Sequence, residues 1–136
     1  MIYGKIWGST EPLLVTPFIE VHRIFIEAGT HCSTHKHEYK HNMFYVVEGQ
    51  LEIHVTKEDY DLEDVTELYD GQYTTVRPGE YHKFVAVTDV EALEIYYPEP
   101  LSADIIRKDV GGFAETANTV VNLETVTPYG EPQNDD

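Results

Sequence analysis

Four histidines lie close together in one short segment, and their chemistry is easy to name. The four are His31, His35, His37 and His41, which fall within eleven residues. In an extended strand, side chains two positions apart point the same way, about 7 Å apart along the chain, so His35 and His37 would present two imidazoles together. Imidazoles bind transition metals, and His82, from another segment, would supply a third. The spacing therefore predicts a histidine metal centre.

The segments that carry these histidines have the pattern of short β-strands. Apolar residues alternate with polar ones far more often than they recur at helical spacing. Strands are expected at residues 21–26, 42–48, 51–56, 73–76, 82–87 and 92–97. For residues 58–68, an irregular hairpin extension is favoured over a short acidic helix. A sheet of this size must close or double over to bury its apolar face, so we expect an all-β sandwich or barrel.

Length and composition bound the class of protein. The 136 residues fit one domain, and 25 acidic against 9 basic residues give a formal net charge of −16, which disfavours a nucleic-acid partner. Without a long apolar run or an evident export signal, we expect no membrane span and a cytoplasmic location. The single cysteine, Cys32, excludes an internal disulfide. One domain is expected over residues 1–127, followed by a flexible acidic tail over residues 128–136.

The histidine segment resembles the first signature of the cupin family, G-x5-H-x-H-x3/4-E-x6-G. Gly29, His35, His37 and Gly49 occupy its glycine and histidine positions with the same spacing. The glutamate of the signature is replaced by Asn42. This resemblance implies that both histidines are metal ligands.

A later segment resembles the second cupin signature, G-x5-P-x-G-x2-H-x3-N. Gly71, Gly79 and His82 match it, Pro78 is shifted by one place, and Ala86 stands at the asparagine position. Together the two signatures identify the chain as similar to single-domain cupins of the conserved-barrel type. The fold that this implies is a double-stranded β-helix, the cupin or jelly-roll barrel.

The fourth metal ligand is left open between two neighbouring residues. A spacing of four after His37 leads to Asn42, and a spacing of three leads to His41. Strand alternation points these two side chains to opposite faces, so only one can join the site. A carboxamide lacks the charge of a carboxylate and is a weaker ligand for hard cations. The expected cofactor is a divalent transition metal: zinc, iron, manganese or nickel.

A looser likeness is to the cupin domain of type II mannose-6-phosphate isomerases. It rests on Trp7–Gly8, residues 21–24, residues 93–95 and residues 104–107, besides the paired signatures. The likeness implies aldose–ketose isomerisation of a sugar phosphate, with the metal stabilising an enediolate while a base moves a proton. Substrate contacts expected on this view are Arg23, Arg77, Tyr45, Lys83 and Tyr96. The base is not identified, and Glu94 is a further candidate for it.

Two other functions remain open from the sequence. One is a different metal-dependent cupin enzyme, such as a dioxygenase or a lyase. The other is a non-catalytic module that binds a sugar or another small molecule, with Asn42 marking a weakened metal site. The resemblance also implies a homodimer with a small-molecule ligand, and neither nucleic acid nor membrane is expected as a partner.

Overall fold

The computed structural model describes residues 1–57, 62–98 and 105–114. The chain divides into two units, Met1–Pro100 and Leu101–Asp136, and every strand of the described part lies in the first. Residues 105–114 carry neither helix nor strand. In these described ranges no helix is long and apolar enough to cross a membrane. The expected domain boundary at residue 127 and the tail over 128–136 lie outside the described residues and stay predictions.

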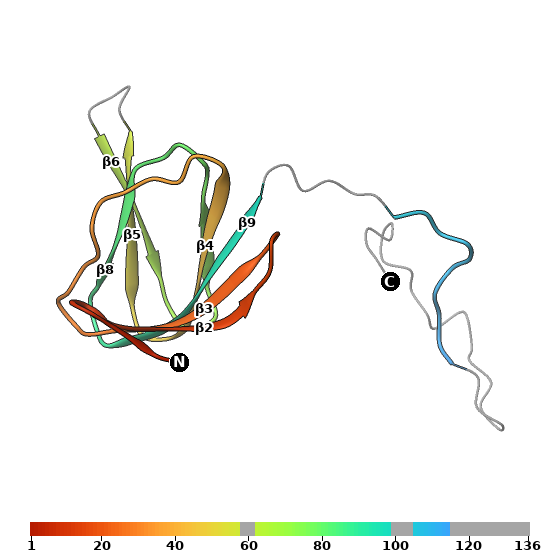
Figure 1. The fold of residues 1–136 in the computed structure, drawn as a ribbon, viewed down its shortest axis with the longest axis horizontal. Helices are drawn as coiled ribbons and strands as arrows, with labels where there is room; N and C mark the ends of the chain where they lie inside the picture. Colours follow the sequence, from red (N-terminus) through yellow and green to blue (C-terminus); the bar gives the residue numbers. More distant parts are fainter. Residues whose placement is uncertain (58–61, 99–104, 115–136) are drawn as a thin grey trace. The chain divides into compact units, whose positions relative to one another are not determined.

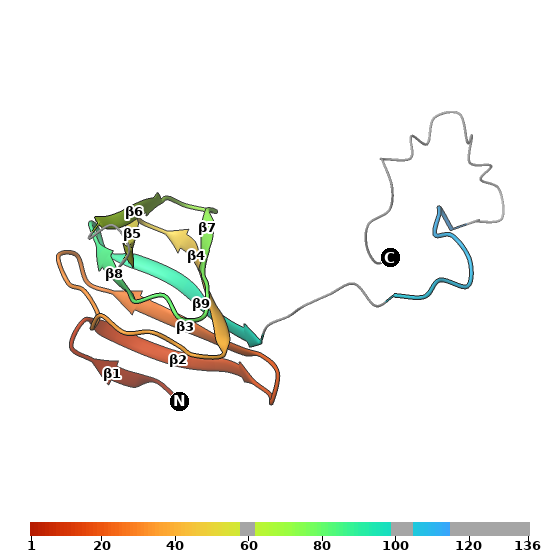
Figure 2. The ribbon, with the colours of Figure 1, turned by 90° about the horizontal axis from the view of Figure 1, so that it is seen from above.

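Nine strands build two antiparallel sheets in the described part of the first unit. Figures 1 and 2 show the arrangement of these sheets from two directions. The strands are β1 (Tyr3–Lys5), β2 (Gly8–Val15), β3 (Glu20–Ile26), β4 (Lys40–Glu48), β5 (Leu51–Lys57), β6 (Leu62–Leu68), β7 (Tyr73–Val76), β8 (His82–Ala86) and β9 (Val90–Pro98). One sheet has the order β1-β2-β3-β9-β4-β7 and the other β6-β5-β8. The predicted all-β jelly-roll fold is confirmed.

The predicted strands agree with the observed ones to within about two residues at each end, but three observed strands were not predicted. Over residues 62–68 the expected hairpin extension is confirmed, because β6 pairs antiparallel with β5, but it is regular and not irregular, in register from Leu51↔Leu68 to Lys57↔Leu62. Residues 58–61 lie outside the described residues. All β6 side chains except Leu68 are exposed, so the strand carries no apolar alternation. The strands β1 and β2 were also missed.

The core lies between the two sheets and takes alternate residues from each strand. On β4, Phe44 and Val46 are fully buried, and Asn42 points the same way because it is two residues before Phe44. Opposite them, β8 buries His82, Phe84 and Ala86. Asn42 is 0% and His82 1% exposed, and they are the two polar residues among the buried ones of the described chain. The interior therefore becomes polar at one end.

Candidate metal centre

Backbone hydrogen bonds join the two segments that carry the predicted histidines. The amide of His35 donates to the carbonyl of His82 at 3.0 Å, and the amide of His82 donates back to His35 at 2.8 Å. The amide of Gly79 donates to the carbonyl of His37 at 2.7 Å. Gly79 has φ +85°, a left-handed conformation that favours glycine, so the turn before β8 can reach His37. The chain itself therefore positions the histidines.

Three of the seven histidines converge on one point. One ring nitrogen each of His35, His37 and His82 lies within 4.8 Å of the other two, which is close enough for the rings to share an ion after small rotations. The ring centroids are 4.6 Å apart for His35 and His82 and 5.5 Å apart for His37 and His82. These are the three histidines that the sequence pattern selected.

Backbone carbonyls fix the orientation of two of these rings. The Nδ1 of His35 is 2.8 Å from the carbonyl oxygen of Ser33, and the Nδ1 of His82 is 2.9 Å from that of Glu80. A carbonyl only accepts hydrogen bonds, so each Nδ1 carries the proton and donates it. In the neutral ring, each Nε2 is then a bare acceptor. This is the state in which histidine binds a metal.

The third ring, His37, has a nitrogen with no hydrogen-bonding partner. Its Nε2 is buried, although the residue as a whole is half-buried. Burial, reinforced by the positive charge of Lys40 and by the imidazoles of His35 and His82, lowers the pKa of His37 to about 4, and the neighbouring Asn42 opposes this shift only in part. Burial also lowers the pKa of His82. His37 and His82 are therefore neutral at pH 7, as metal ligands must be.

Asn42 completes this group from β4. Its Oδ1 lies 3.1 Å from the Nε2 of His82, and its Nδ2 lies 3.3 Å from Oε2 of Glu94 on β9. By contrast, His41 pairs with Tyr97, stacks on its ring at 4.9 Å, and is outside the three-histidine cluster. Of the two alternatives for a fourth ligand, the structure therefore brings Asn42 to the imidazoles.

The expected substrate-binding residues are dispersed. Arg23, Tyr45 and Lys83 alternate with inward-facing residues of β3, β4 and β8, so their side chains lie on the outer faces of the sheets. Arg77 is exposed in the turn after β7. Only Tyr96, among these five, lies beside the cluster, with its ring 5.2 Å from that of His37.

A cavity of about 290 Å³ opens beside the cluster. Its lining is Lys5, Trp7, Thr10, His22, Cys32, Ser33, His35, Phe84, Glu94 and Tyr96. Trp7, Thr10 and Lys5 belong to the N-terminal part of the chain, where no site was expected. Burial raises the pKa of Cys32 to about 11, so its thiol stays protonated and is a poor nucleophile.

Glu94 and Tyr96 give this cavity its proton-binding groups. Burial raises the pKa of Glu94, although hydrogen bonds from Tyr96 and Asn42 oppose the shift. Burial, together with the nearby Glu94 carboxylate, raises the pKa of Tyr96 as well. Strand parity could have placed Glu94 here, because it shares a face of β9 with the buried Ala92.

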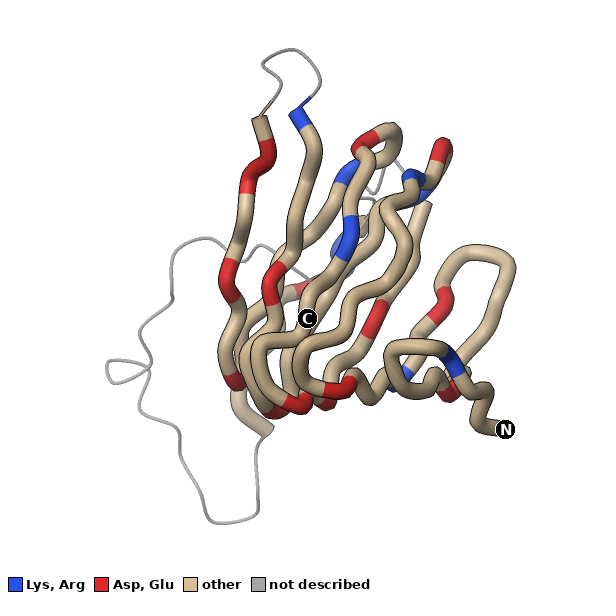
Figure 3. The backbone as a smooth tube through the Cα atoms, turned by 90° about the vertical axis from the view of Figure 1, so that its left-hand side faces the viewer, with Lys and Arg blue, Asp and Glu red and all other residues tan. Residues whose placement is uncertain are grey.

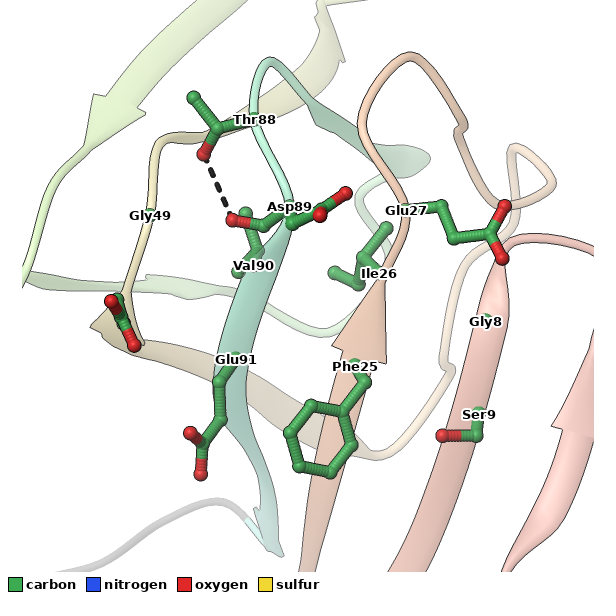
Figure 4. Close-up of a pocket in the computed structure, with 11 residues that line it drawn as sticks. Gly8, Ser9, Phe25, Ile26, Glu27, Gly49, Thr88, Asp89, Val90 and Glu91 are labelled. Carbon is green, nitrogen blue, oxygen red and sulfur yellow. Dashed lines mark hydrogen bonds between the residues drawn. The ribbon is translucent and has the colours of Figure 1, made fainter.

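The larger cavity, about 740 Å³, lies at the other end of the barrel (Figure 4). Four carboxylates stand in its lining: Glu27, Glu48, Asp89 and Glu91. The strand register shows that this cavity and the histidines lie at opposite ends of β4. Glu48 pairs with Glu91 at one end, whereas Asn42 pairs with Tyr96 at the other. In Figure 3 this end of the barrel is at the bottom, and acidic residues, drawn in red, lie along its turns. The three-histidine cluster thus lies beside the smaller cavity and not beside the larger one.

The fold and the histidine cluster agree with a comparison against known families. The cupin domain family matches residues 22–96, more than half of the chain, so the chain belongs to the cupin family. The structure is similar to KdgF from Halomonas sp., with a TM-score of 0.63 and 18% identity over 74% of this chain and 89% of that one. At such identity the likeness shows the fold alone.

Two larger proteins contain a similar fold. Oxalate decarboxylase of Bacillus subtilis, which has Mn(II) centres, gives a TM-score of 0.62 with 14% identity over 74% of this chain and 28% of that one. The capsular polysaccharide assembling protein CapF of Staphylococcus aureus gives 0.63 with 18% identity over 74% and 29%. The chain spans less than a third of either. No curated protein matches it, and the likeness to mannose-6-phosphate isomerases gains no support.

Proposed function

We propose that this cupin binds one divalent transition metal through His35, His37 and His82, with Asn42 as the fourth ligand. The observation that carries the proposal is the buried Nε2 of His37, which has no hydrogen bond. The ring of His37 packs against those of His35 and His82, whose Nε2 atoms can bind a metal ion. A buried polar atom without a partner costs about 1–3 kcal/mol. A metal ion would remove that cost and explain the arrangement.

The contact between Asn42 and His82 supports the same proposal. Because Nδ1 of His82 donates to a carbonyl, its Nε2 is an acceptor, and it faces a second acceptor, Oδ1 of Asn42, at 3.1 Å. Two acceptors at this distance need a proton or a cation between them. Two ligands at about 2.1 Å from one ion are roughly 3.0–3.4 Å apart at ligand angles of 90–109°. The observed separation fits a shared metal.

The chemistry that follows is the activation of a small, oxygen-rich ligand in the cavity beside the cluster. A bound divalent metal would polarise a carbonyl or hydroxyl oxygen of that ligand. Lys5 contributes a positive charge at the cavity, while Glu94 and Tyr96 are placed to hold or move a proton. Aldose–ketose isomerisation is the reaction that we propose to test first. The phosphate of such a substrate would bind Lys5, because the cavity lining, among the described residues, holds this lysine and no arginine.

Metal analysis of protein purified without chelator tests the proposal. We expect about one equivalent of a transition metal in the wild type and little in His35→Ala and His82→Ala. His54→Ala is the matched control, because His54 lies on the outer face between Glu52 and Glu63 and should leave the metal content unchanged. Unchanged metal in both cluster variants would contradict the assignment. A screen of sugar phosphates with the loaded protein then tests the isomerase reaction.

We also propose that the protein acts in the cytoplasm as a homodimer. The outer face of the six-stranded sheet leaves Phe25, Val47 and Tyr73 between 41% and 63% exposed, and a second copy would cover such side chains. The single cysteine is buried and free, as is common in a reducing compartment. Light scattering of the purified chain tests the dimer, and fractionation of the source cells tests the location.

A further inference from the structure

We propose that Glu94 is the positioning residue that makes Asn42 a metal ligand. On this view, Oε2 of Glu94 holds the amide of Asn42 by its nitrogen and turns the amide oxygen toward the imidazoles. A bound divalent ion would favour the ionised form of Glu94, which would then supply the negative charge that position 42 lacks. The inference rests on the proposed metal centre. It concerns how this chain supplies charge without a carboxylate ligand.

The geometry places Glu94 directly behind Asn42. Nδ2 of Asn42 lies 3.3 Å from Oε2 of Glu94, and Oδ1 of the same amide lies 3.1 Å from Nε2 of His82. On the neighbouring strands β4 and β9, Asn42 pairs with Tyr96 and Phe44 pairs with Glu94. Asn42 and Glu94 are therefore diagonal neighbours on the inner face.

Burial restricts the amide of Asn42 to partners inside the protein. Asn42 is 0% exposed, so its nitrogen and oxygen must find their partners inside the protein. An amide nitrogen only donates hydrogen bonds, so the acceptor oxygen Oε2 of Glu94 selects the nitrogen of Asn42 and not its oxygen. The oxygen then faces the three imidazoles. An outer carboxylate that orients a ligating group in this way strengthens a metal site.

The charge of the site points to the same residue. Three neutral imidazoles and one amide leave both charges of a divalent ion uncompensated. Glu94 is the one carboxylate among the described residues that line the adjacent cavity. The four carboxylates of the larger cavity lie at the opposite end of the barrel. Other acidic side chains have partners of their own: Glu20 contacts His22, Glu52 and Glu63 contact His54, and Glu80 contacts Lys57. Removing the charge of Glu94 should therefore weaken the site more than removing another acidic charge nearby.

Titration of the metal-free full chain with Zn²⁺ and Co²⁺ tests the inference. We expect Glu94→Gln, which keeps the size but not the charge, to bind both ions about 10–100-fold more weakly than the wild type. Glu20→Gln is the matched control, because it removes a nearby charge without touching Asn42, and its affinity should stay within about twofold. The visible spectrum of bound Co²⁺ reports any change of ligands.

The double variant Asn42→Asp with Glu94→Gln separates a charge role from a structural one. It exchanges the carboxylate and the amide between the two positions without changing the size of either side chain. We expect it to recover the affinity that Glu94→Gln loses, with a changed Co²⁺ spectrum.

The role of Glu94 would be overturned if Glu94→Gln bound the metal as tightly as the wild type. It would also be overturned if the double variant bound the metal as weakly as Glu94→Gln while melting at the same temperature as the wild type. Absence of binding by the wild type would instead overturn the metal centre itself. If Glu94→Gln does not fold, the double variant alone decides, because recovery of tight binding in it supports the charge exchange and weak binding overturns it.

Discussion

Replacing His37 by leucine should stabilise the metal-free protein while removing tight metal binding. The Nε2 of His37 is buried without a hydrogen bond, a situation that costs about 1–3 kcal/mol. Because the residue is only half-buried, we take the lower end of that range, about 1 kcal/mol. Leucine has no polar atom to satisfy and would pack against Tyr96 and His82, which the ring of His37 now contacts. The metal-free variant should therefore be more stable than the metal-free wild type.

The expected shift is large enough to measure by thermal unfolding. For a unit the size of Met1–Pro100, 1 kcal/mol corresponds to about 4–8 °C in melting temperature. Metal at about one hundred times its Kd stabilises the native state by roughly 2.7 kcal/mol. With chelator, the His37→Leu variant should melt above the wild type. With saturating Zn²⁺, the order should reverse, because only the wild type gains stability from the ion.

A second histidine-to-leucine variant provides the control. His54 contacts Glu63 at 2.8 Å and Glu52 at 2.9 Å, so His54→Leu should lower stability with and without metal and should retain the shift caused by Zn²⁺. If His37→Leu melts several degrees below the wild type in chelator, His37 does not carry an unsatisfied nitrogen. If it keeps the shift caused by Zn²⁺, His37 is not a ligand.

Two further predictions concern the scaffold. In urea unfolding, Gly49→Ala should lower the free energy of unfolding by at least twice the ~1–2 kcal/mol expected for Gly71→Ala. Both glycines have positive φ, but of the two only Gly49 would bring its new Cβ against a backbone oxygen, that of Asp89. Equal losses would contradict this. Burial opposes the charge of His54, but Glu52 and Glu63 outweigh it and raise its pKa. This stability is complete below about pH 6.5 and is lost as pH rises through the raised pKa, so His54→Gln should cost up to about 1 kcal/mol more at pH 6 than at pH 9; equal costs would refute it.

The sequence was most informative where spacing alone decides geometry. His35 and His37 are two residues apart, and the glycines around them resemble a known signature, so their convergence with His82 could be predicted. The choice between His41 and Asn42 could not be made, because one residue of spacing reverses the face of a strand. The register of β4 against β9 places Asn42 inward, and that register is a tertiary property.

The strands that were missed lack the period that the prediction relied on. Almost every β6 side chain is exposed, and β2 shifts register between Pro12 and Leu14, so neither shows a clean alternation. The N-terminal residues of the cavity, such as Trp7, were missed for a related reason. Trp7 meets Phe84 through a ring contact at 4.9 Å between residues far apart in the sequence, and no local pattern reports such a contact.

The way the histidines are held bears on what a metal would contribute to this protein. His35 and His82 are joined by two backbone hydrogen bonds, and Gly79 donates one to His37, so main-chain contacts fix the positions of the three histidines. Metal-dependent miniature domains lack such support and unfold without their ion. Here the ion should add stability by mass action alone, and its affinity should depend on side chains that orient and charge the ligands. We therefore expect Asn42 and Glu94, rather than the fold, to determine how tightly the metal binds.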